Sequence, residues 1–560
     1  MIEDHERHSS SRHKSLNLRY SLISHNLFMN LTGQQLIGYR ESAKSDETFP
    51  AFDPCNGTGL ETFFYEATEK EIGEAVELAE SVFSEFRDLS AEARADFLEA
   101  ICDETTALGD KLLERAAAET GHPLARCEME RNRIIQQAHL FSELIREGSW
   151  ADARIDLGDT NRQPMPKPDV RSMMQPIGPI AVFGASNFPI AISVLGADTI
   201  SAFAAGCPVI VKAHPAHPGT CELAARAILG AAKRCNMPEG IFSMIHGRST
   251  KVGGYLVQHP GIMAAAFTGS LAGGRALMDV AAARPVPIPF YAEMGSVNPI
   301  FVLPGALTQK KEQIASGFVT SLTMGVGQFC TNPGLVAGIG SDDWDNFSEL
   351  VAKKVTEFAP STMLHAGIHE AYTKGIELRN ESAVLELIGK SSARPNPDAC
   401  EAAAYVFQTS RRGIMSDPTL LDELFGPVST LVNCEGVDDM VAVAEKLGGS
   451  LSASVHGTEE DLIDFHPLLS VLQRKAGRLI FNGYPVGIEV CHSIHHGGPY
   501  PATSHSFFTS IGTRCIERFV RPVCYQDWPD SQLPLELQNA NPRNVWRIVD
   551  GARSNSALKV

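Results

Sequence analysis

The chain has 560 residues and a formal net charge of −18. Because a single hydrophobic core stops growing at about 250 to 300 residues, this length predicts two or three domains. The acidic balance argues against nucleic acid or an anionic membrane as a partner. No uninterrupted apolar run reaches the roughly 18 residues that indicate a membrane-spanning helix.

The twelve cysteines include no CxxC pair. In a chain of this length, that distribution indicates reduced thiols rather than a disulfide framework, and it predicts a cytoplasmic protein. Residues 1–28 combine histidines with basic residues and lack the apolar core of a signal peptide, so they are predicted to form a disordered N-terminal extension. Met29 follows this extension, and translation starts at either Met1 or Met29.

The first long element is a helix predicted over residues 69–88, where apolar residues recur at steps of three and four. Similar patterns predict helices over 108–119 and 131–146, separated by a break at Pro123. Residues 152–157 then alternate polar with apolar side chains, which predicts a half-exposed strand. Prolines after residue 163 continue this stretch as an extended segment.

From residue 178 onward, short apolar runs alternate with helical patterns. Strands are predicted over 178–183, 208–211, 241–245 and 263–267, with helices ending near 205 and covering 220–232. This alternation predicts a parallel sheet with helices on both faces, whose ligands bind beyond the carboxyl ends of the strands. The pattern repeats with a strand over 299–303, a helix over 310–323 and a late strand over 479–483, whereas 396–417 is predicted to be polar and irregular.

Four short motifs carry the chemistry. Cys330 lies within the Gly-Gln-Phe-Cys-Thr-Asn-Pro-Gly run of residues 327–334, where permissive glycines surround a thiol that could serve as a nucleophile. Upstream, Glu293 follows a predicted strand and precedes a glycine, and residues 267–274 form a glycine-rich turn. Downstream, a Glu-Leu-Phe-Gly-Pro run begins at Glu423.

In this order, the four motifs resemble those of the aldehyde dehydrogenase superfamily. The fuller forms over 290–296 and 327–334 look most like its 2-oxoglutarate semialdehyde (2,5-dioxopentanoate) dehydrogenase branch, which is related to a bacterial NADP-linked fatty aldehyde dehydrogenase. The resemblance covers about residues 30 to 555. It implies oxidation of an aldehyde to a carboxylic acid, most closely 2-oxoglutarate semialdehyde to 2-oxoglutarate.

The resemblance also implies an α/β fold with two doubly wound parallel-sheet domains and a small antiparallel oligomerisation arm. Residues 29–150 and 176–290 would form the nicotinamide cofactor-binding domain, and residues 291–495 the catalytic domain. Residues 151–175 and 496–560 would form the arm and the C-terminal tail, which bridge subunits in a homodimer or homotetramer. A plain surface loop is the alternative for residues 151–175.

The chemistry needs a thiolate, because an aldehyde carbon gives up hydride easily only after it becomes tetrahedral and anionic. Cys330 would attack to form a thiohemiacetal, and the thioester left after hydride transfer would be hydrolysed. The resemblance assigns the oxyanion donor to Asn187, together with the Cys330 backbone N–H, at about 3 kcal/mol each. It assigns the general base to Glu293, and we expect burial to raise the pKa of that carboxyl.

The cofactor contacts follow from the resemblance too. Lys212 would bind ribose hydroxyls, and Glu423 and Phe425 would hold and flank the nicotinamide ribose. The turn that contains Gly269, Ser270 and Gly274 would approach the pyrophosphate with helix N-terminal donors.

The resemblance bears on the choice of cofactor as well. Pro215 stands where many NAD-preferring members carry a glutamate, so the main bar to a 2′-phosphate is absent. His214 and Arg248 could add contacts to that phosphate. NADP is therefore predicted as the preferred cofactor, with NAD still usable.

Several alternatives stay open. Cys491, His492, His495 and His496 suggest a zinc site, but a structural site needs four converging ligands and no second cluster supplies them, so no metal is predicted. An NADP-dependent fatty aldehyde dehydrogenase fits the related branch. A cysteine-dependent thioester hydrolase would use the same cysteine without a nucleotide, and a structural protein would leave the motifs unexplained. The sequence names no residue for the substrate carboxylate.

Overall fold

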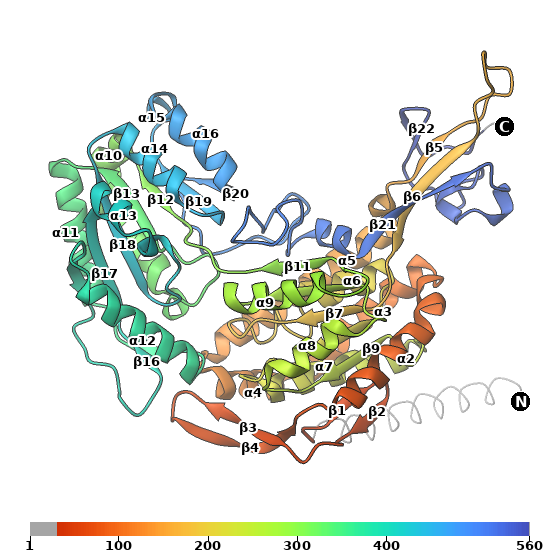
Figure 1. Cartoon of the computed structure of the whole chain (residues 1–560), viewed down its shortest axis with the longest axis horizontal. Helices are drawn as coiled ribbons and strands as arrows, with labels where there is room; N and C mark the ends of the chain where they lie inside the picture. The colour runs from red at the N-terminus through yellow and green to blue at the C-terminus, as the bar shows by residue number, and fades with distance from the viewer. Residues whose placement is uncertain (1–30, 559–560) are drawn as a thin grey trace, which may run out of the picture.

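The computed structural model describes residues 31–558, so the predicted extension over 1–28 and the alternative start at Met29 lie outside the described residues. This part of the chain contains two seven-stranded sheets and a five-stranded arm sheet, together with two small two-stranded sheets. Each large sheet carries helices on both faces, and the arm projects away from both of them (Figure 1). The predicted pair of doubly wound sheets is confirmed.

The first sheet has the strand order β11-β10-β7-β8-β9-β1-β2, in which the first five strands are parallel and β1 and β2 form an antiparallel edge. The strands are β1 (Gln35–Ile37), β2 (Arg40–Ser42), β7 (Ile180–Phe183), β8 (Val209–Lys212), β9 (Phe242–Ile245), β10 (Ala264–Thr268) and β11 (Phe290–Glu293). A separate hairpin pairs β3 (Thr48–Asp53) with β4 (Thr58–Tyr65).

Alternate residues of these strands enter two different cores. On one face, Ile180 and Val182 pack with α3 (Ala91–Ala107), α4 (Asp110–Thr120), α5 (Leu124–Glu147), α6 (Ala197–Ala205) and α7 (Pro218–Arg234). On the other face, Ala181 and Phe183 pack with α2 (Glu69–Arg87), α8 (Thr250–Gln258) and α9 (Leu271–Ala282). A strand buried on both faces has no polar side, which is why it reads as a continuous apolar run.

The second sheet has the order β15-β17-β18-β13-β12-β19-β20, with an antiparallel edge at β15. Its strands are β12 (Ile300–Val302), β13 (Leu335–Ile339), β15 (Glu386–Lys390), β17 (Tyr405–Ser410), β18 (Val428–Cys434), β19 (Ser450–His456) and β20 (Ala476–Phe481). One face packs α10 (Pro304–Thr323) and α11 (Asp342–Thr356), and the other packs α13 (Arg411–Ser416), α14 (Val437–Lys446) and α16 (His466–Lys475). Beside them lie α12 (Ala366–Glu381), α15 (Glu459–Asp464) and the pair β14 (Ser361–Thr362) and β16 (Glu401–Ala402).

The prediction that residues 396–417 are irregular is wrong. Strand β17 lies inside the second sheet, parallel to β18, and α13 follows it directly. Val406 and Phe407 are buried, but polar residues on both sides of this short run hide it in the sequence. A buried strand of a few residues offers too little periodicity to separate it from a loop.

The arm sheet has the order β21-β6-β5-β22-β23. Its strands are β5 (Arg154–Asp156), β6 (Val170–Pro176), β21 (Val520–Gln526), β22 (Arg547–Val549) and β23 (Ala552–Ser554). The pairs are antiparallel except β22 with β5, which is parallel. Buried Arg171 holds the arm together, since it pairs with Asp169 at 2.7 Å and donates to the Leu537 carbonyl at 2.6 Å.

Two segments lie elsewhere than the sequence analysis placed them. The predicted domain boundary between residues 290 and 291 divides strand β11, but the whole strand belongs to the first sheet, beside β10. Residues 496–519 were assigned to the arm and tail, but Thr503 bridges Glu293 at the end of β11, and the arm resumes only at β21. Among the described residues, no helix is long and apolar enough to cross a membrane.

Candidate active site

The loop that carries Cys330 is a left-handed turn. Gly325, Val326 and Gly327 have φ of +54°, +58° and +65° between α10 and the cysteine. A Cβ on Gly327 would lie 2.3 Å from the backbone carbon of Gly426, so no larger residue fits there without moving the chain. The glycine that precedes the nucleophile therefore allows two backbone segments to pass in contact.

Asn298 fixes the loop from the other side. Its amide donates to the carbonyls of Cys330 at 2.9 Å and Asn332 at 3.0 Å, and its oxygen accepts from the Ser296 and Ser452 hydroxyls. Asn298 is fully buried, with φ of +49°. The sequence analysis gave this residue no role, although asparagine is among the few residues that tolerate such a backbone.

The thiol of Cys330, the imidazole of His496 and the carboxylate of Glu293 form one contact group (residues 293, 330 and 496). His496 Nε2 lies 3.4 Å from Cys330 Sγ and 3.1 Å from Glu293 Oε1. Ser510 donates to the second carboxylate oxygen of Glu293. Glu293 is 4% exposed and His496 only 2%, so this group is almost closed to water except at the half-buried cysteine.

The electrostatics follow from this geometry. Enclosure by protein raises the pKa of the Cys330 thiol well above its ordinary value, and the negative charge of Glu293 raises it further. Burial alone would raise the pKa of Glu293, but His496 and the hydrogen bond from Ser510 outweigh it, so that the pKa of Glu293 lies below its ordinary value. The expected rise was wrong in sign, because the sequence showed the burial but not the partners.

The zinc alternative is not supported by the geometry. His492 contacts the Thr513 hydroxyl at 3.2 Å, while His496 turns to Glu293. Within residues 31–558, the one cluster with metal-ligand geometry is Glu293, Cys330 and His496, whose ligand atoms lie within 4.8 Å of one another. His496 was thus noticed for the wrong chemistry, and Ser510 was not noticed at all.

Asn187 is buried beside the nucleophile loop. Its Nδ2 donates at 3.0 Å to the carbonyl of Gln328, two residues before Cys330. Its own carbonyl accepts from Arg126 at 3.0 Å and lies 3.3 Å from His122 Nε2, which fixes the turn after β7. The amide is therefore held next to the loop where an oxyanion on the aldehyde carbon would form.

Lys212 is the last residue of β8, His214 follows that strand, and Arg248 follows the neighbouring strand β9. Burial lowers the pKa of Lys212 to about 8, and Glu66 acts against that shift through its negative charge. The Glu66 carboxylate accepts from the backbone N–H of Arg248 at 2.7 Å and of Ser249 at 3.0 Å. The side chain of His214 stacks on His217 with ring centroids 5.2 Å apart, whereas Arg248 is exposed.

The glycine-rich turn joins β10 to α9. Ser270 is the N-cap of α9 and accepts from the Gly273 N–H at 3.2 Å. A Cβ on Gly274 would lie 2.7 Å from the Met294 sulfur, and one on Gly269 would lie 2.7 Å from the Phe267 ring. These glycines let the helix approach the sheet closely, while Ser270 and the residue after it stay exposed. An exposed helix N-terminus at the carboxyl end of parallel strands suits a dinucleotide pyrophosphate.

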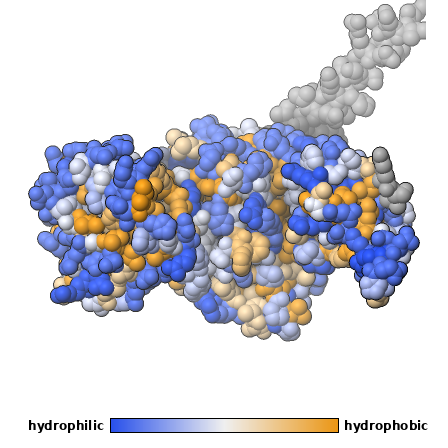
Figure 2. Space-filling model, turned by 90° about the horizontal axis from the view of Figure 1, so that it is seen from above, coloured by the Kyte–Doolittle hydropathy of each residue, from blue (hydrophilic) through white to orange (hydrophobic). Residues whose placement is uncertain are grey.

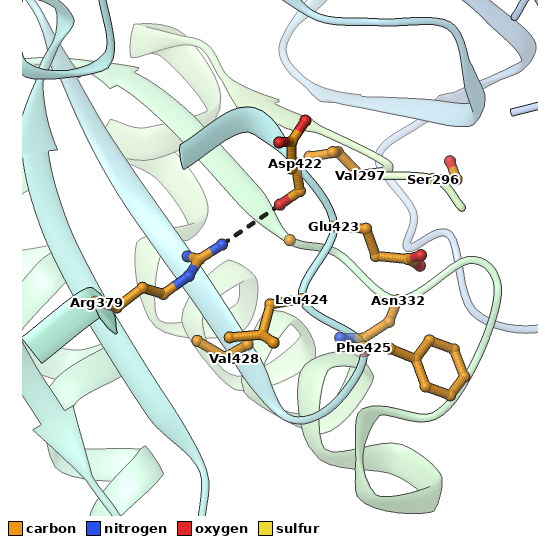
Figure 3. A pocket seen from close by; sticks show the side chains of 10 residues that line it. Ser296, Val297, Asn332, Arg379, Asp422, Glu423, Leu424, Phe425 and Val428 are labelled. Atoms are coloured by element: carbon orange, nitrogen blue, oxygen red, sulfur yellow. Dashed lines mark hydrogen bonds between the residues drawn. The ribbon is translucent and has the colours of Figure 1, made fainter. Parts of the chain in front are cut away.

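Glu423 and Phe425 lie in a pocket with Ser296, Val297 and Asn332 (Figure 3). Their side chains point to the opposite side of the segment from Arg379, which donates to the Asp422 carbonyl. A Cβ on Gly295 would lie 2.6 Å from Glu423 Oε2, so the glycine after Glu293 makes room for this carboxylate. Burial raises the pKa of Glu423 to about 8, and its ionised form raises the pKa of the Cys330 thiol slightly further.

Comparison with known proteins identifies the class. Residues 39–498 match the model of the aldehyde dehydrogenase family, and the chain belongs to that family. It is 47% identical over 524 residues to alpha-ketoglutaric semialdehyde dehydrogenase 2 of Azospirillum brasilense, covering 93% of this chain and 99% of the relative. It is 42% identical over 521 residues to alpha-ketoglutaric semialdehyde dehydrogenase of Acinetobacter baylyi, covering 93% and 98%.

Solved structures agree on the fold. Betaine aldehyde dehydrogenase from Staphylococcus aureus in complex with NAD+ is similar to this chain with a TM-score of 0.76 and 17% sequence identity, covering 91% of this chain and 98% of that one. Structural neighbours in the family thus bind a nicotinamide dinucleotide. The family assignment makes this chain an enzyme that oxidises aldehydes, as the four motifs predicted.

The raised pKa of Cys330 gives a direct test of the electrostatics. Removing a negative charge beside a thiol favours the thiolate and lowers the thiol pKa. We therefore expect Glu293→Gln to move the pH profile of Cys330 alkylation by iodoacetamide to lower pH, read by mass spectrometry of the Cys330 peptide. Glu423→Gln is the matched control and should move the profile less, because its charge acts more weakly. An unchanged profile, or one moved to higher pH, in Glu293→Gln would contradict this account.

Proposed function

We propose that this chain oxidises 2-oxoglutarate semialdehyde to 2-oxoglutarate with a nicotinamide dinucleotide, as a cytoplasmic enzyme. The observation that carries the reaction is the contact group of Cys330, His496 and Glu293. The assignment of the substrate rests on the similarity to two alpha-ketoglutaric semialdehyde dehydrogenases over 93% of the chain. The twelve cysteines are free thiols, which suits a reducing compartment.

The first step is proton transfer within the contact group. A buried thiol with a raised pKa is a poor nucleophile until a base takes its proton. His496 Nε2 lies 3.4 Å from Cys330 Sγ and can take this proton, and with it His496 becomes a donor to Glu293. The product is a thiolate beside an imidazolium that also faces a carboxylate, so the proton transfer leaves the net charge of the contact group unchanged and places the one cation between the two anions.

The thiolate then attacks the aldehyde carbon, and the carbonyl oxygen becomes an oxyanion. Asn187 supplies one N–H donor beside the loop and the backbone N–H of Cys330 supplies another. Such donors stabilise the oxyanion by about 3 kcal/mol each, because they are oriented before the charge develops. A bound nicotinamide would supply the hydride acceptor, and the thiohemiacetal carbon would be the hydride donor.

Hydrolysis of the resulting thioester needs a base that is ionised at neutral pH. Glu293 meets this need because its pKa lies below the ordinary value, although a low pKa also makes it a weaker base. It takes a proton from water, the hydroxide adds to the thioester carbon, and the carbon–sulfur bond breaks to free the carboxylic acid. The Cys330 sulfur then regains a proton from His496, and Glu293 releases its proton to solvent. The same set would serve a thioester hydrolase that needs no nucleotide.

The separate roles predict separate mutant kinetics. Cys330→Ala should abolish dehydrogenase activity and keep nucleotide binding, since it removes the nucleophile and little volume. Glu293→Gln should slow thioester hydrolysis more than hydride transfer, so that a first-turnover burst of reduced cofactor persists in stopped-flow absorbance. Cys491→Ala, a half-buried cysteine near His492, is the control and should behave as wild type.

Two outcomes would contradict these assignments. Substantial aldehyde oxidation by Cys330→Ala would show that Cys330 is not the nucleophile. Loss of the burst of reduced cofactor in Glu293→Gln would show that Glu293 has a role other than thioester hydrolysis. Thioester cleavage without nucleotide, at a rate above that of aldehyde oxidation, would favour the hydrolase instead.

We further propose that NADP is preferred and that NAD is still usable. Lys212, His214 and Arg248 would meet the adenosine ribose and its 2′-phosphate, with Gly269, Ser270 and Gly274 at the pyrophosphate and Glu423 and Phe425 at the nicotinamide ribose. Pro215 supports the preference because it carries no charge. Glu66 opposes it, since this carboxylate lies near Lys212 and occupies the N–H groups of Arg248 and Ser249.

The cofactor preference is tested by kcat/KM with each dinucleotide. The wild type should favour NADP, and Arg248→Ala should lose about tenfold with NADP, or about 1.4 kcal/mol, with little change for NAD. Glu66→Gln should raise the ratio of NADP to NAD efficiency, because it removes a repulsive charge. Lys251→Ala, an exposed cation on α8, is the matched control. An efficiency at least about tenfold higher with NAD than with NADP would refute the preference.

We also propose that the arm joins subunits. Among the described residues, strand β20 is the last strand at one edge of the second sheet and exposes Leu479 at 46% and Phe481 at 48%, which is unusual for an edge that stays unpaired. Trp528 and Trp546, in the segments that belong to the arm, are exposed as well. Hydrophobic patches are also visible on the molecular surface between hydrophilic areas (Figure 2). An arm strand of one subunit would extend the sheet of another at β20.

A charge on this edge should therefore separate subunits. We expect the double variant Leu479→Glu, Phe481→Glu to shift the mass measured by light scattering toward that of a single chain. Leu387→Glu, on the opposite edge strand β15 and 43% exposed, is the matched control and should keep the wild-type mass. An unchanged mass for the β20 variant would place the subunit contact elsewhere.

A further inference from the structure

Three guanidinium groups surround the nucleophile, and two of them have fixed partners. Arg126 pairs with Glu130 at 3.2 Å, donates to the Asn187 carbonyl and lies 4.4 Å from the centre of the Phe329 ring. Arg478 donates to the carbonyls of Pro485 at 2.5 Å and Gly487 at 3.2 Å. Both therefore serve to hold protein segments in place.

Arg133 is the third and has no such partner. Within residues 31–558 its guanidinium makes neither a hydrogen bond nor an ion pair, and its central carbon lies 5.9 Å from the centre of the Phe188 ring. Its charge nevertheless acts on the Cys330 thiol and lowers the pKa of that group against the larger effect of burial. A half-buried cation that is left unpaired beside a nucleophile is available to a ligand.

A second unpaired donor lies one helical turn away. Gln137 follows Arg133 by four residues on α5, so both side chains lie on the same face of the helix. It is only 3% exposed, and its Nε2 has no hydrogen-bond partner among the described residues. Leaving a buried amide donor unpaired costs about 1 to 3 kcal/mol, which a bound acceptor would recover.

Arg133 and Gln137 line one pocket together with Thr268, Ser193 and Ser510. Ser510 connects this pocket to the contact group, because its hydroxyl donates to Glu293. The pocket also contains Asp198, but Arg518 pairs with that carboxylate at 2.7 Å and balances its charge. Among the residues that line the pocket, Arg133 is then the one whose charge has no ion-pair partner in the described part of the chain. The carboxylates of Glu130 and Glu293 act on it from outside the lining, and its free donors suit an anion.

We propose that Arg133 and Gln137 bind the end of the substrate away from the aldehyde, with the Arg133 guanidinium on its carboxylate. The adjoining 2-oxo oxygen is an acceptor without charge, which matches the neutral amide of Gln137. This assignment rests on the proposed function and gives it the residue that selects an aldehyde with a carboxylate. An uncharged aldehyde would leave both donors unpaired in the pocket.

The test compares charged and uncharged aldehydes. For Arg133→Gln we expect kcat/KM to fall by about 30-fold with 2-oxoglutarate semialdehyde and with succinate semialdehyde, mainly through KM, and to stay within about twofold with pentanal. Arg133→Lys should recover part of the loss, since it restores the charge without the planar fork. Arg131→Gln is the matched control, because Arg131 lies on the same helix but pairs with Glu128 and the Gly109 carbonyl.

The possible outcomes separate this inference from the proposed substrate. An equal loss with all three aldehydes, or no loss with the charged ones, would overturn the role of Arg133 even if 2-oxoglutarate semialdehyde is the best substrate. Poor turnover of 2-oxoglutarate semialdehyde by the wild type, with succinate semialdehyde oxidised in an Arg133-dependent way, would overturn the substrate and uphold Arg133. An unchanged far-ultraviolet circular dichroism spectrum and thermal unfolding midpoint in Arg133→Gln would show that the variant is folded.

Discussion

A single imidazole nitrogen lies within hydrogen-bond distance of both the Cys330 sulfur and the Glu293 carboxylate. Without it, a thiolate and a carboxylate would be forced together in a buried site, where two like charges cannot both persist. With it, the proton that leaves the thiol stays between the two anions. Burial and the charge of Glu293 raise the pKa of Cys330, whereas His496 helps to lower the pKa of Glu293, so the two shifts have different causes within one contact group.

The position of His496 depends on close backbone packing far from the nucleophile in sequence. Its N–H donates to Thr509 at 2.8 Å, and two glycines follow it along the chain. A Cβ on Gly498 would lie 2.2 Å from the Ser450 carbonyl oxygen, and one on Gly477 would lie 2.0 Å from that of Gly497. The segment after His496 is therefore pressed against β19 and β20, and only glycine permits that approach.

Sequence reasoning reached the parts of the molecule that local pattern encodes. The parallel strands read as apolar runs because both of their faces are buried, and Cys330 and Glu293 lie in short motifs. The sequence did not predict the contact between His496 and Glu293, because the two residues are 203 positions apart and no local spacing marks the contact. The effect of Glu66 on Lys212 was missed for the same reason, because Glu66 comes from a distant segment. The expected direction of the Glu293 pKa shift was wrong because the partners of Glu293 are also distant in sequence.

The net charge of the chain and the charge of its active-site pocket have opposite consequences for an anionic substrate. Charges farther away than a Debye length of about 8 Å are largely screened at physiological ionic strength, so the overall charge of −18 has little effect inside the pocket. Near Cys330, the charges of Arg126 and Asp198 are balanced by Glu130 and Arg518. Arg478 keeps its charge, but two backbone carbonyls occupy its donors. Among the described residues, Arg133 is the cation whose donors stay available to an entering carboxylate, and it would let an acidic protein select an acidic aldehyde.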